Sequence, residues 1–262
     1  MRASNLNAPH VVYQDEAIFV IVKPAGMPSV SLQKGMQDSL AAWIKKKFPN
    51  QAKIGKASDA GLAHRLDNDT SGLIVVAKTN DAYENLRRQF SGHSDILKEY
   101  TALVIGSPPN EGSIVTPIAH HSRKKKKMIV CESDEKTKTL NARSAITSFE
   151  VLKRYKSPHV RRRVSGNQCP TPPSAYSLLR VRIVTGVRHQ IRVHLASIGF
   201  PIAGDRLYQN PKKRLEDTLP LKRHFLHASR LGFLHPKTGK WIEVKSALPD
   251  ELKEVLALCR RV

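Results

Sequence analysis

The residues best suited to chemistry lie in the polar stretch His64–Leu73, and Asp67 stands at its centre. Arg65 precedes this aspartate by two residues, and three hydrogen-bonding residues follow it. A nearby cation and hydrogen-bond donors keep a carboxylate ionised and oriented. An aspartate held in this way can act as a nucleophile or a general base. The same residue types also form ordinary turns, and composition alone favours that simpler interpretation.

The residues that follow this stretch must hold it in place. The β-branched run Ile74–Ala77 lies between a glycine and Lys78, a pattern that predicts a buried strand. The polar residues before the run then form a loop that leads into the strand. Loops fixed by buried strands are a frequent location of catalytic residues.

The string H-R-L-D-x-x-T-S-G-L-x-x-x-A-K, from His64 to Lys78, resembles the signature of the RluA-type pseudouridine synthases. Members of this family isomerise uridine in RNA to its C-glycoside. The resemblance implies that Asp67 is the catalytic residue, and we assign Arg65 to substrate binding.

A second candidate lies in Lys98–Ile105, which alternates as a strand. Tyrosine in a strand usually serves packing, but a tyrosine close to a lysine can also stack on a flipped base. The pattern K-x-Y-x-A resembles the family's second motif, whose tyrosine lies against the target base. We therefore expect Tyr100 to be a catalytic residue and Lys98 to bind substrate.

A helix is predicted after Thr185-Gly186, because Ile191, Leu195 and Ile198 repeat at helical spacing and Gly199 suits the C-cap. Its first turn would carry basic residues one turn apart, which suits an anion site. A surface helix with basic side chains on its solvent face is the simpler alternative.

The same segment, T-G-x-x-H-Q-I-R-x-H-L, resembles the family's third motif. The resemblance implies that Arg192 is a catalytic residue that pairs with the catalytic carboxylate. We assign Arg188, His189 and Gln190 to substrate binding. The family usually has Arg or Lys directly after T-G, where this chain has Val187, and Arg188 is the candidate for that phosphate contact.

Two other segments resemble family motifs and are expected to have supporting roles. Lys23-Pro24-x-Gly26 resembles the opening motif, although a plain proline turn has the same residues. Gly204-Asp205-x-x-Tyr208 resembles a later one, with Gln209 where the family usually has glycine. With the C-terminal hairpin predicted over 225–244, the resemblance extends from about Val11 to Leu252.

Charge is the outstanding feature of the composition: 44 Lys and Arg against 22 Asp and Glu give a net charge of +22. Such an excess attracts polyanions, most commonly nucleic acid. A membrane surface fits this charge distribution less well as a partner, because the cations are not gathered on one amphipathic helix. The three cysteines are far apart, which argues against a disulfide framework and a zinc site. No apolar run is long enough to cross a bilayer, and we expect a cytoplasmic monomer that binds RNA and no membrane.

Two basic segments have open roles. Arg123–Lys127 is five consecutive cations, which could bind phosphates, form a mobile, solvated charge block or serve as a localisation signal. The segment 153–174 contains three consecutive arginines and several prolines, and we interpret it as an irregular basic insertion between two strands.

The resemblance implies an α+β fold: a central mixed, mostly antiparallel sheet with a cleft, flanked by helices and loops. We expect an N-terminal extension over 1–10, a catalytic domain over 11–252 and a tail over 253–262. We expect no separate RNA-binding domain before Val11.

Three functions fit the residues to different degrees. Uridine isomerisation in rRNA or tRNA ranks first and requires no cofactor, because it involves no redox step or energy input. An RNA-binding protein without catalysis ranks second, but such a protein has no use for a carboxylate in an arginine-rich site. A glycosidase ranks third, because it needs a second carboxylate with a raised pKa, and nothing marks Asp69 as that acid.

Overall fold

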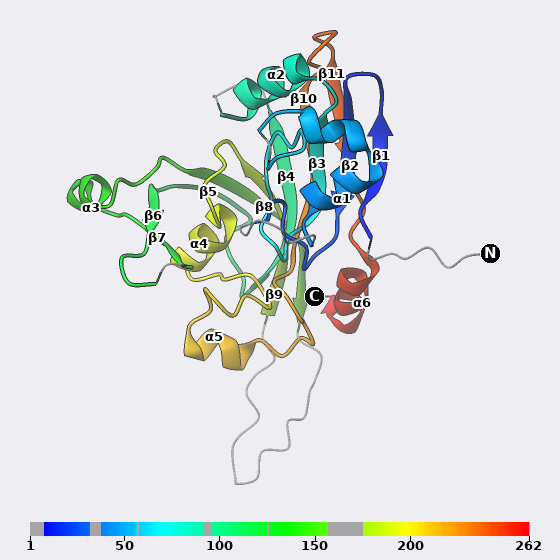
Figure 1. Ribbon diagram of the computed structural model, residues 1–262. Coiled ribbons are helices and arrows are strands. Elements are labelled where there is room, and N and C mark those ends of the chain that lie inside the picture. Colours follow the sequence, from blue (N-terminus) through cyan, green and yellow to red (C-terminus); the bar gives the residue numbers. More distant parts are fainter. Residues whose placement is uncertain are drawn as a thin grey trace, which may run out of the picture. The chain divides into compact units, whose positions relative to one another are not determined.

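The computed structural model describes residues 8–31, 38–56, 58–91, 96–124, 126–156 and 175–261 (Figure 1). Backbone contacts divide the chain into two compact units. The first unit contains Met1–Glu99 and His227–Ala247, and the second contains Tyr100–Leu226 and Leu248–Val262. Each unit contains some of the residues that the sequence analysis predicts to be functional.

The first unit is built on a sheet with the strand order β1-β2-β3-β10, and β11 pairs with β10. The strands are β1 (His10–Gln14), β2 (Ile18–Lys23), β3 (Ser71–Ala77), β10 (Leu226–Leu234) and β11 (Trp241–Lys245). The pairing of β3 with β10 is parallel, and the other pairings in this unit are antiparallel. The C-terminal hairpin implied by the family resemblance is confirmed as β10–β11, and β1 and β2 form a second antiparallel hairpin.

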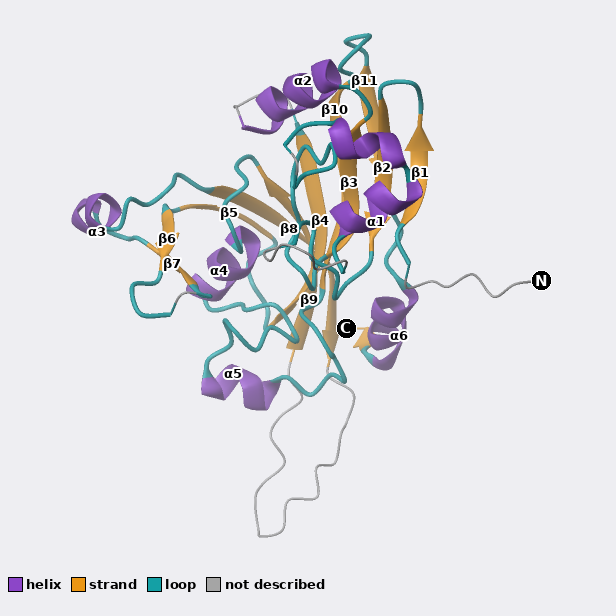
Figure 2. Ribbon diagram, in the orientation of Figure 1, coloured by secondary structure: helices purple, strands orange, loops and turns teal. Residues whose placement is uncertain are grey.

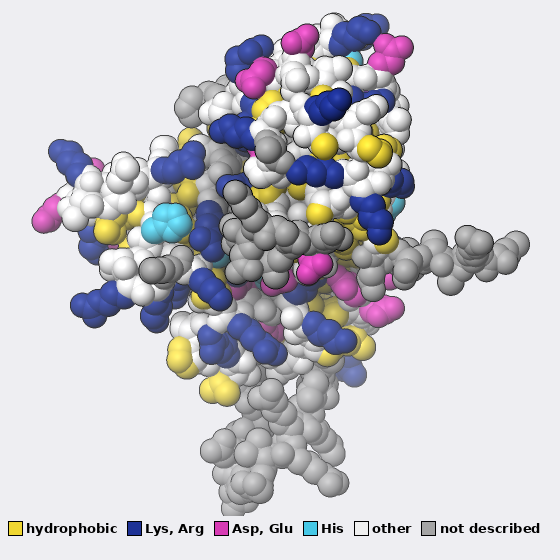
Figure 3. Space-filling view, viewed as in Figure 1, with side chains coloured by type: hydrophobic (Ala, Val, Ile, Leu, Met, Phe, Trp, Pro, Cys, Tyr) yellow, Lys and Arg dark blue, Asp and Glu magenta, His cyan; other side chains and the backbone are white. Residues whose placement is uncertain are grey.

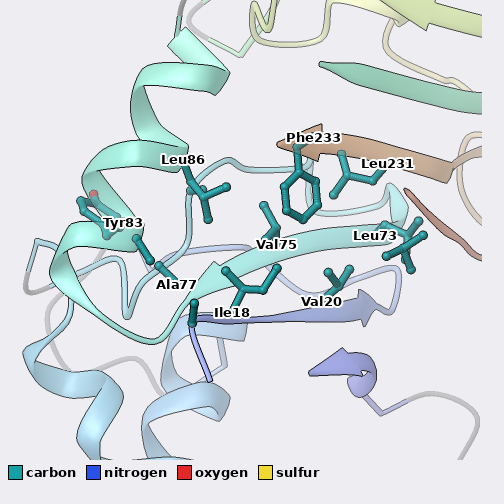
Figure 4. Close-up of a cluster of buried hydrophobic side chains, with 13 residues drawn as sticks. Ile18, Val20, Leu73, Val75, Ala77, Tyr83, Leu86, Leu231 and Phe233 are labelled. Atoms are coloured by element: carbon teal, nitrogen blue, oxygen red, sulfur yellow. The ribbon is translucent and has the colours of Figure 1, made fainter. Parts of the chain in front are cut away.

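The core of this unit forms around β3, which is buried along its whole length. Helix α2 (Asn80–Ser91) contributes Leu86, which lies near Val75 and Phe233, and Tyr83, which lies toward Ala77 (Figure 4). The predicted strand after the Asp67 loop is therefore confirmed. The unit also contains α1 (Leu40–Lys47), capped by Ser39, and the short helix η1 (Pro49–Lys53).

The second unit has the strand order β4-β9-β8-β12, with β5 also paired to β8. These strands are β4 (Leu97–Ile105), β5 (Glu111–Val115), β8 (Ile146–Lys156), β9 (Ala175–Ile183) and β12 (Arg260–Arg261). A separate antiparallel pair consists of β6 (Ile118–His120) and β7 (Met128–Val130). The helices are α3 (Asp134–Thr139), α4 (Gln190–Ser197), α5 (Pro211–Glu216) and α6 (Asp250–Leu258).

Two segments are more regular than predicted. Strand β8 continues through Lys156, four residues into the predicted insertion, because β9 pairs with it beyond a bulge after Val151. The rest of the insertion, 157–174, lies outside the described residues. The predicted tail contains most of α6 and the short strand β12, which pairs with β8.

The sheets and the helices on their flanks give an α+β fold with mixed, mostly antiparallel pairing, as predicted (Figure 2). Within the described ranges, no helix has the length and apolar character needed to span a membrane.

Candidate active site

The loop that carries Asp67 is held on both sides of this residue. On one side, the backbone N–H of Leu66 donates to the Ser29 hydroxyl at 3.1 Å, and that hydroxyl donates to the Leu66 carbonyl at 2.9 Å. On the other side, the Asn68 carbonyl accepts from the Lys23 ammonium at 2.9 Å. Asp67 itself is half-buried. The backbone at Asp67 is thus fixed while the residue keeps access to solvent.

Lys23 is fully buried, which is unusual for a lysine. Its ammonium donates to the carbonyls of Pro24 at 2.8 Å, Met27 at 2.7 Å and Asn68 at 2.9 Å. An ammonium buried in this way is tolerated because carbonyl oxygens accept its donors. Lys23 therefore joins the K-P-x-G turn to the catalytic loop. Local sequence patterns do not reveal this role, because Lys23 and Asn68 are 45 residues apart.

The end of the loop is set by a close approach of two strands. Gly72 has φ 123°, and a Cβ there would lie 2.3 Å from the Ala228 carbonyl oxygen. The next pair along the register, Ser71 and His227, is joined by a 2.9 Å hydrogen bond between Oγ and Nδ1. Glycine is required at position 72 because any side chain would push β3 and β10 apart.

His64 begins the motif and has a packing role. Its ring stacks on Phe90 with centroids 4.3 Å apart, and its Nε2 accepts the Val75 N–H at 3.2 Å. Burial of the ring, with a smaller contribution from the charge of Lys98, lowers the pKa of His64 to about 3. The imidazole is therefore neutral near pH 7 and braces the loop against β3 and α2.

Two residues assigned to substrate binding lie in the first unit. Lys98 is buried, its ammonium lies 6.0 Å from the centre of the Phe90 ring, and burial lowers its pKa to about 8. Arg65 is exposed, next to His64 in the loop. Substrate contact by either residue remains a prediction.

The second unit contains the other two predicted catalytic residues. Tyr100 lies on β4 and is 8% exposed, and Arg192 lies on α4 and is also 8% exposed. Arg192 makes a bidentate ion pair with buried Asp205, with Nε–Oδ2 at 2.6 Å and Nη2–Oδ1 at 3.0 Å. A bidentate pair fixes both the position and the plane of a guanidinium. The sequence pattern predicts only a supporting turn at Asp205 and does not reveal this ion pair.

The turn that presents Asp205 is held by Asp217. One carboxylate oxygen of Asp217 accepts the Gly204 N–H and the Gln209 side-chain amide, each at 2.6 Å. The same Gln209 amide donates to the Ile202 carbonyl at 3.1 Å. Gln209 is buried, so the residue that replaces the family's usual glycine ties the turn together.

The residues around the start of α4 differ in their surroundings. Arg188 is exposed, whereas His189 takes a left-handed conformation with φ 56°. The Gln190 amide donates to the Ile146 carbonyl at 2.9 Å and accepts from Val187 N–H at 3.1 Å. Val187 is buried in a small apolar cluster. Its side chain therefore cannot make the phosphate contact expected of the Arg or Lys that the family usually has at this position. Substrate contact by the residues from 188 to 190 remains a prediction.

In the part of the chain that the structure describes, no group of three or more His, Cys, Asp or Glu side chains is arranged to hold a metal ion. Cys131 and Cys259 are buried free thiols.

Comparisons with known proteins place these residues in context. The model of the family described as RNA pseudouridylate synthase matches residues 17–197. The chain is similar to ribosomal large subunit pseudouridine synthase D of Zymomonas mobilis, with 34% identity over 247 residues, 93% of this chain and 70% of that protein. The enzyme of the same name from Pseudomonas aeruginosa is 34% identical over 262 residues, 96% of this chain and 72% of that protein.

Solved structures show the same fold. The human RNA pseudouridylate synthase domain containing 1 has a TM-score of 0.68 at 23% identity, covering 100% of this chain and 92% of that one. The human RNA pseudouridylate synthase domain containing 4 has a TM-score of 0.65 at 23% identity, covering 95% of this chain and 92% of that one.

Proposed function

Because the chain belongs to the RNA pseudouridylate synthase family and is therefore an isomerase, we propose that it converts uridine to pseudouridine in large-subunit ribosomal RNA, with Asp67 as the catalytic residue. In this reaction the N1–C1′ bond of uridine breaks, the uracil turns, and C5 bonds to C1′. The C5 proton leaves and N1 gains one, so the product is an isomer of the substrate.

The clamped backbone on both sides of Asp67 is the observation that carries this proposal. Leu66 and Asn68 are held by Ser29 and Lys23, yet the aspartate between them stays half-buried rather than sealed. A catalytic group needs this combination, because a fixed backbone limits its positions while access allows substrate to reach it.

The other proposed roles follow from side-chain type and setting. Tyr100 offers an aromatic face on which a base can stack, and Arg192 supplies a cation that favours the ionised form of the catalytic carboxylate. Arg65 and Arg188 are exposed and are proposed to bind phosphates of the RNA. Lys98, His189 and Gln190 are proposed to line the path of the substrate. No cofactor enters this reaction.

The ribosomal substrate is proposed from the names of the relatives, which refer to the large ribosomal subunit. The experiment is pseudouridine mapping of total RNA from cells that contain the wild-type protein, Asp67→Asn or Asp69→Asn. Asp69 is the matched control, because it is exposed, lies two residues away and has no proposed role. We expect large-subunit rRNA sites to disappear with Asp67→Asn and to persist with Asp69→Asn.

Each other outcome has a distinct meaning. Sites that persist in Asp67→Asn would overturn the catalytic assignment, and sites that disappear only from tRNA would overturn the ribosomal substrate. Release of free uracil from RNA by the purified protein would show hydrolysis instead of isomerisation. We also propose that the protein is cytoplasmic, where ribosomal RNA is available, and that it acts as a monomer. Cell fractionation tests the location, and light scattering of the purified protein tests the oligomeric state.

A further inference from the structure

His189 starts helix α4 with an unusual backbone. It is the N-cap residue and has φ 56°, in the left-handed region. Its carbonyl accepts the Val193 N–H at 2.9 Å, but its side chain makes no capping hydrogen bond. Left-handed residues other than glycine persist only where the surrounding structure holds them, and they cluster at functional sites. The half-buried imidazole of His189 is therefore used for a contact other than the cap.

That contact is with Tyr208. His189 Nδ1 lies 2.9 Å from the Tyr208 hydroxyl, and the two rings are nearly perpendicular, with centroids 5.8 Å apart and an interplanar angle of 87°. The hydroxyl oxygen also accepts the backbone N–H of Met128 at 2.9 Å. Tyr208 is buried in an apolar cluster that includes Met128 and Val193. The packing and the hydrogen bond from Met128 together fix the position of the hydroxyl.

The bond from Met128 also decides the direction of the bond between Tyr208 and His189. A backbone N–H can only donate, so the phenolic oxygen accepts from Met128 and its own proton can go to His189 Nδ1. The opposite direction would make this oxygen accept two bonds and would send its proton elsewhere. The charged groups over the ring, Arg192 at 5.2 Å and Lys127 at 5.5 Å from its centre, have donors and no acceptor. In a neutral imidazole the nitrogen that does not accept carries the proton, which here is Nε2.

The surroundings of His189 suit a nucleotide. Arg188 beside it is exposed, and Arg192 lies one turn further along α4. Lys and Arg side chains also lie over α5, which begins shortly after Tyr208 in the chain (Figure 3). Such cations hold an RNA strand by its phosphates and do not read the base. Base recognition needs a donor or an acceptor of fixed type, and an Nε2–H is a donor of fixed type.

We propose that Tyr208 holds His189 in the Nε2–H tautomer, and that this N–H donates to O4 of the target uracil. The proposal rests on the function proposed above for its substrate, and it adds a residue that selects the base. Cytosine has an amino group, a donor, where uracil has O4, whereas both bases have O2. A group that donates and does not accept therefore favours uracil only at O4. Tyr208 is a positioning residue, because it acts on the base only through His189.

The tautomer is measured directly in protein labelled with ¹⁵N-histidine. Two-bond ¹H–¹⁵N correlation spectra at neutral pH show which ring nitrogen carries the proton, and the signals missing from His189→Gln identify His189. We expect a protonated Nε2 and an unprotonated Nδ1 in the wild type. Tyr208→Phe keeps the ring and loses the hydroxyl, so it should give a mixture of tautomers. Tyr13→Phe is the matched control, because its half-buried hydroxyl donates to Asp15 on β1–β2, and its His189 signals should match the wild type.

Turnover tests the contact with O4. The substrates are RNAs that carry the mapped uridine, 4-thiouridine or 2-thiouridine at the target position, because sulfur is a weaker acceptor than oxygen. His189→Leu and His189→Gln both lose the imidazole, but only glutamine keeps a donor. On the uridine RNA, kcat/KM should fall several-fold in His189→Leu and less in His189→Gln. The 4-thio substitution should slow the wild type several-fold and His189→Leu no further, whereas the 2-thio substitution should affect both equally.

The two parts of the proposal fail on different results. A proton on Nδ1 of wild-type His189, or on both ring nitrogens, would overturn the tautomer. An equal 4-thio effect in the wild type and in His189→Leu would overturn the contact with O4. Thermal unfolding shows which variants are folded, and Tyr208→Phe replaces an unfolded His189→Leu, since a mixed tautomer should also reduce the 4-thio effect.

The spectra need no turnover. Failure of this proposal is therefore distinguishable from failure of the proposed function, which would leave the wild-type protein without pseudouridine product.

Discussion

The side-chain ammonium of Lys23 lies 2.9 Å from the carbonyl oxygen of Asn68, the residue directly after Asp67. This contact links the end of β2 to a loop 45 residues later in the chain, and two further carbonyls share the same ammonium. The position of the proposed catalytic loop therefore depends on a residue from a distant part of the sequence.

Replacing Lys23 with methionine should leave three carbonyls without this donor. We expect a decrease of roughly 2–5 kcal/mol in the free energy of unfolding, because each buried polar group without a partner costs about 1–3 kcal/mol. Urea unfolding of the variant and the wild type measures this decrease in the free energy of unfolding. Lys78→Met is the control, since the Lys78 ammonium donates to one carbonyl, that of Asp15. A decrease no larger than in this control would contradict the clamping role.

Replacing Asp205 with asparagine should disturb Arg192 without changing the size of its partner. The buried guanidinium would be left without its bidentate carboxylate, and breaking a buried ion pair costs about 3–5 kcal/mol. We expect lower stability and a kcat reduced at least tenfold, with a smaller change in KM.

The control for Asp205→Asn is Glu251→Gln, which removes the carboxylate of a pair with Arg223 that is half exposed on the glutamate side. Exposed pairs contribute about 0–1 kcal/mol, so this variant should remain close to wild type. Unchanged turnover in folded Asp205→Asn would mean that Asp205 does not position Arg192 for the reaction.

Replacing Gly72 with alanine should prevent the close approach of β3 to β10. The added Cβ would lie 2.3 Å from the Ala228 carbonyl oxygen, and φ at this residue is 123°. We expect a destabilisation above about 3 kcal/mol, the range seen for severe backbone and packing conflicts. Gly186→Ala is the matched control, because no atom lies within 4 Å of a Cβ there. Similar melting temperatures for the two variants would refute the steric argument.

The pH dependence of stability should contain a contribution from His64. Its folded-state pKa is lowered from 6.5 to about 3, so between these values the unfolded chain binds a proton that the folded chain excludes. Stability from this group is fully present above pH 6.5 and falls as the pH falls, by at most about 1.4 kcal/mol per pH unit.

Glutamine at position 64 does not titrate, and its amide oxygen can still accept the Val75 N–H. Urea unfolding of His64→Gln at neutral and acidic pH should therefore show a shallower acid limb than the wild type. His120→Gln, at an exposed histidine, serves as the control. Parallel stability curves for His64→Gln and the wild type would show that the His64 ring is not excluded from protonation by the fold.

The sequence by itself determined the local elements and the candidate chemistry. The β-branched run at Ile74 predicted β3, the alternation from Lys98 predicted β4, and the repeat of Ile191 and Leu195 predicted α4. These patterns are readable because each depends on neighbours within one or two turns or on alternate residues of one strand. The family motif singled out Asp67 in the same way, from contiguous residues.

The tertiary structure alone decided which residues hold the candidate groups in place. Lys23 reaches Asn68, Gly72 meets Ala228, and Asp205 binds Arg192 only after distant strands and turns have come together. Each of these contacts requires burial of a charge or a close backbone approach, and neither is visible in residue type because a lysine or an aspartate is usually exposed. The strand pairings of the fold create the buried environments in which those side chains acquire their partners.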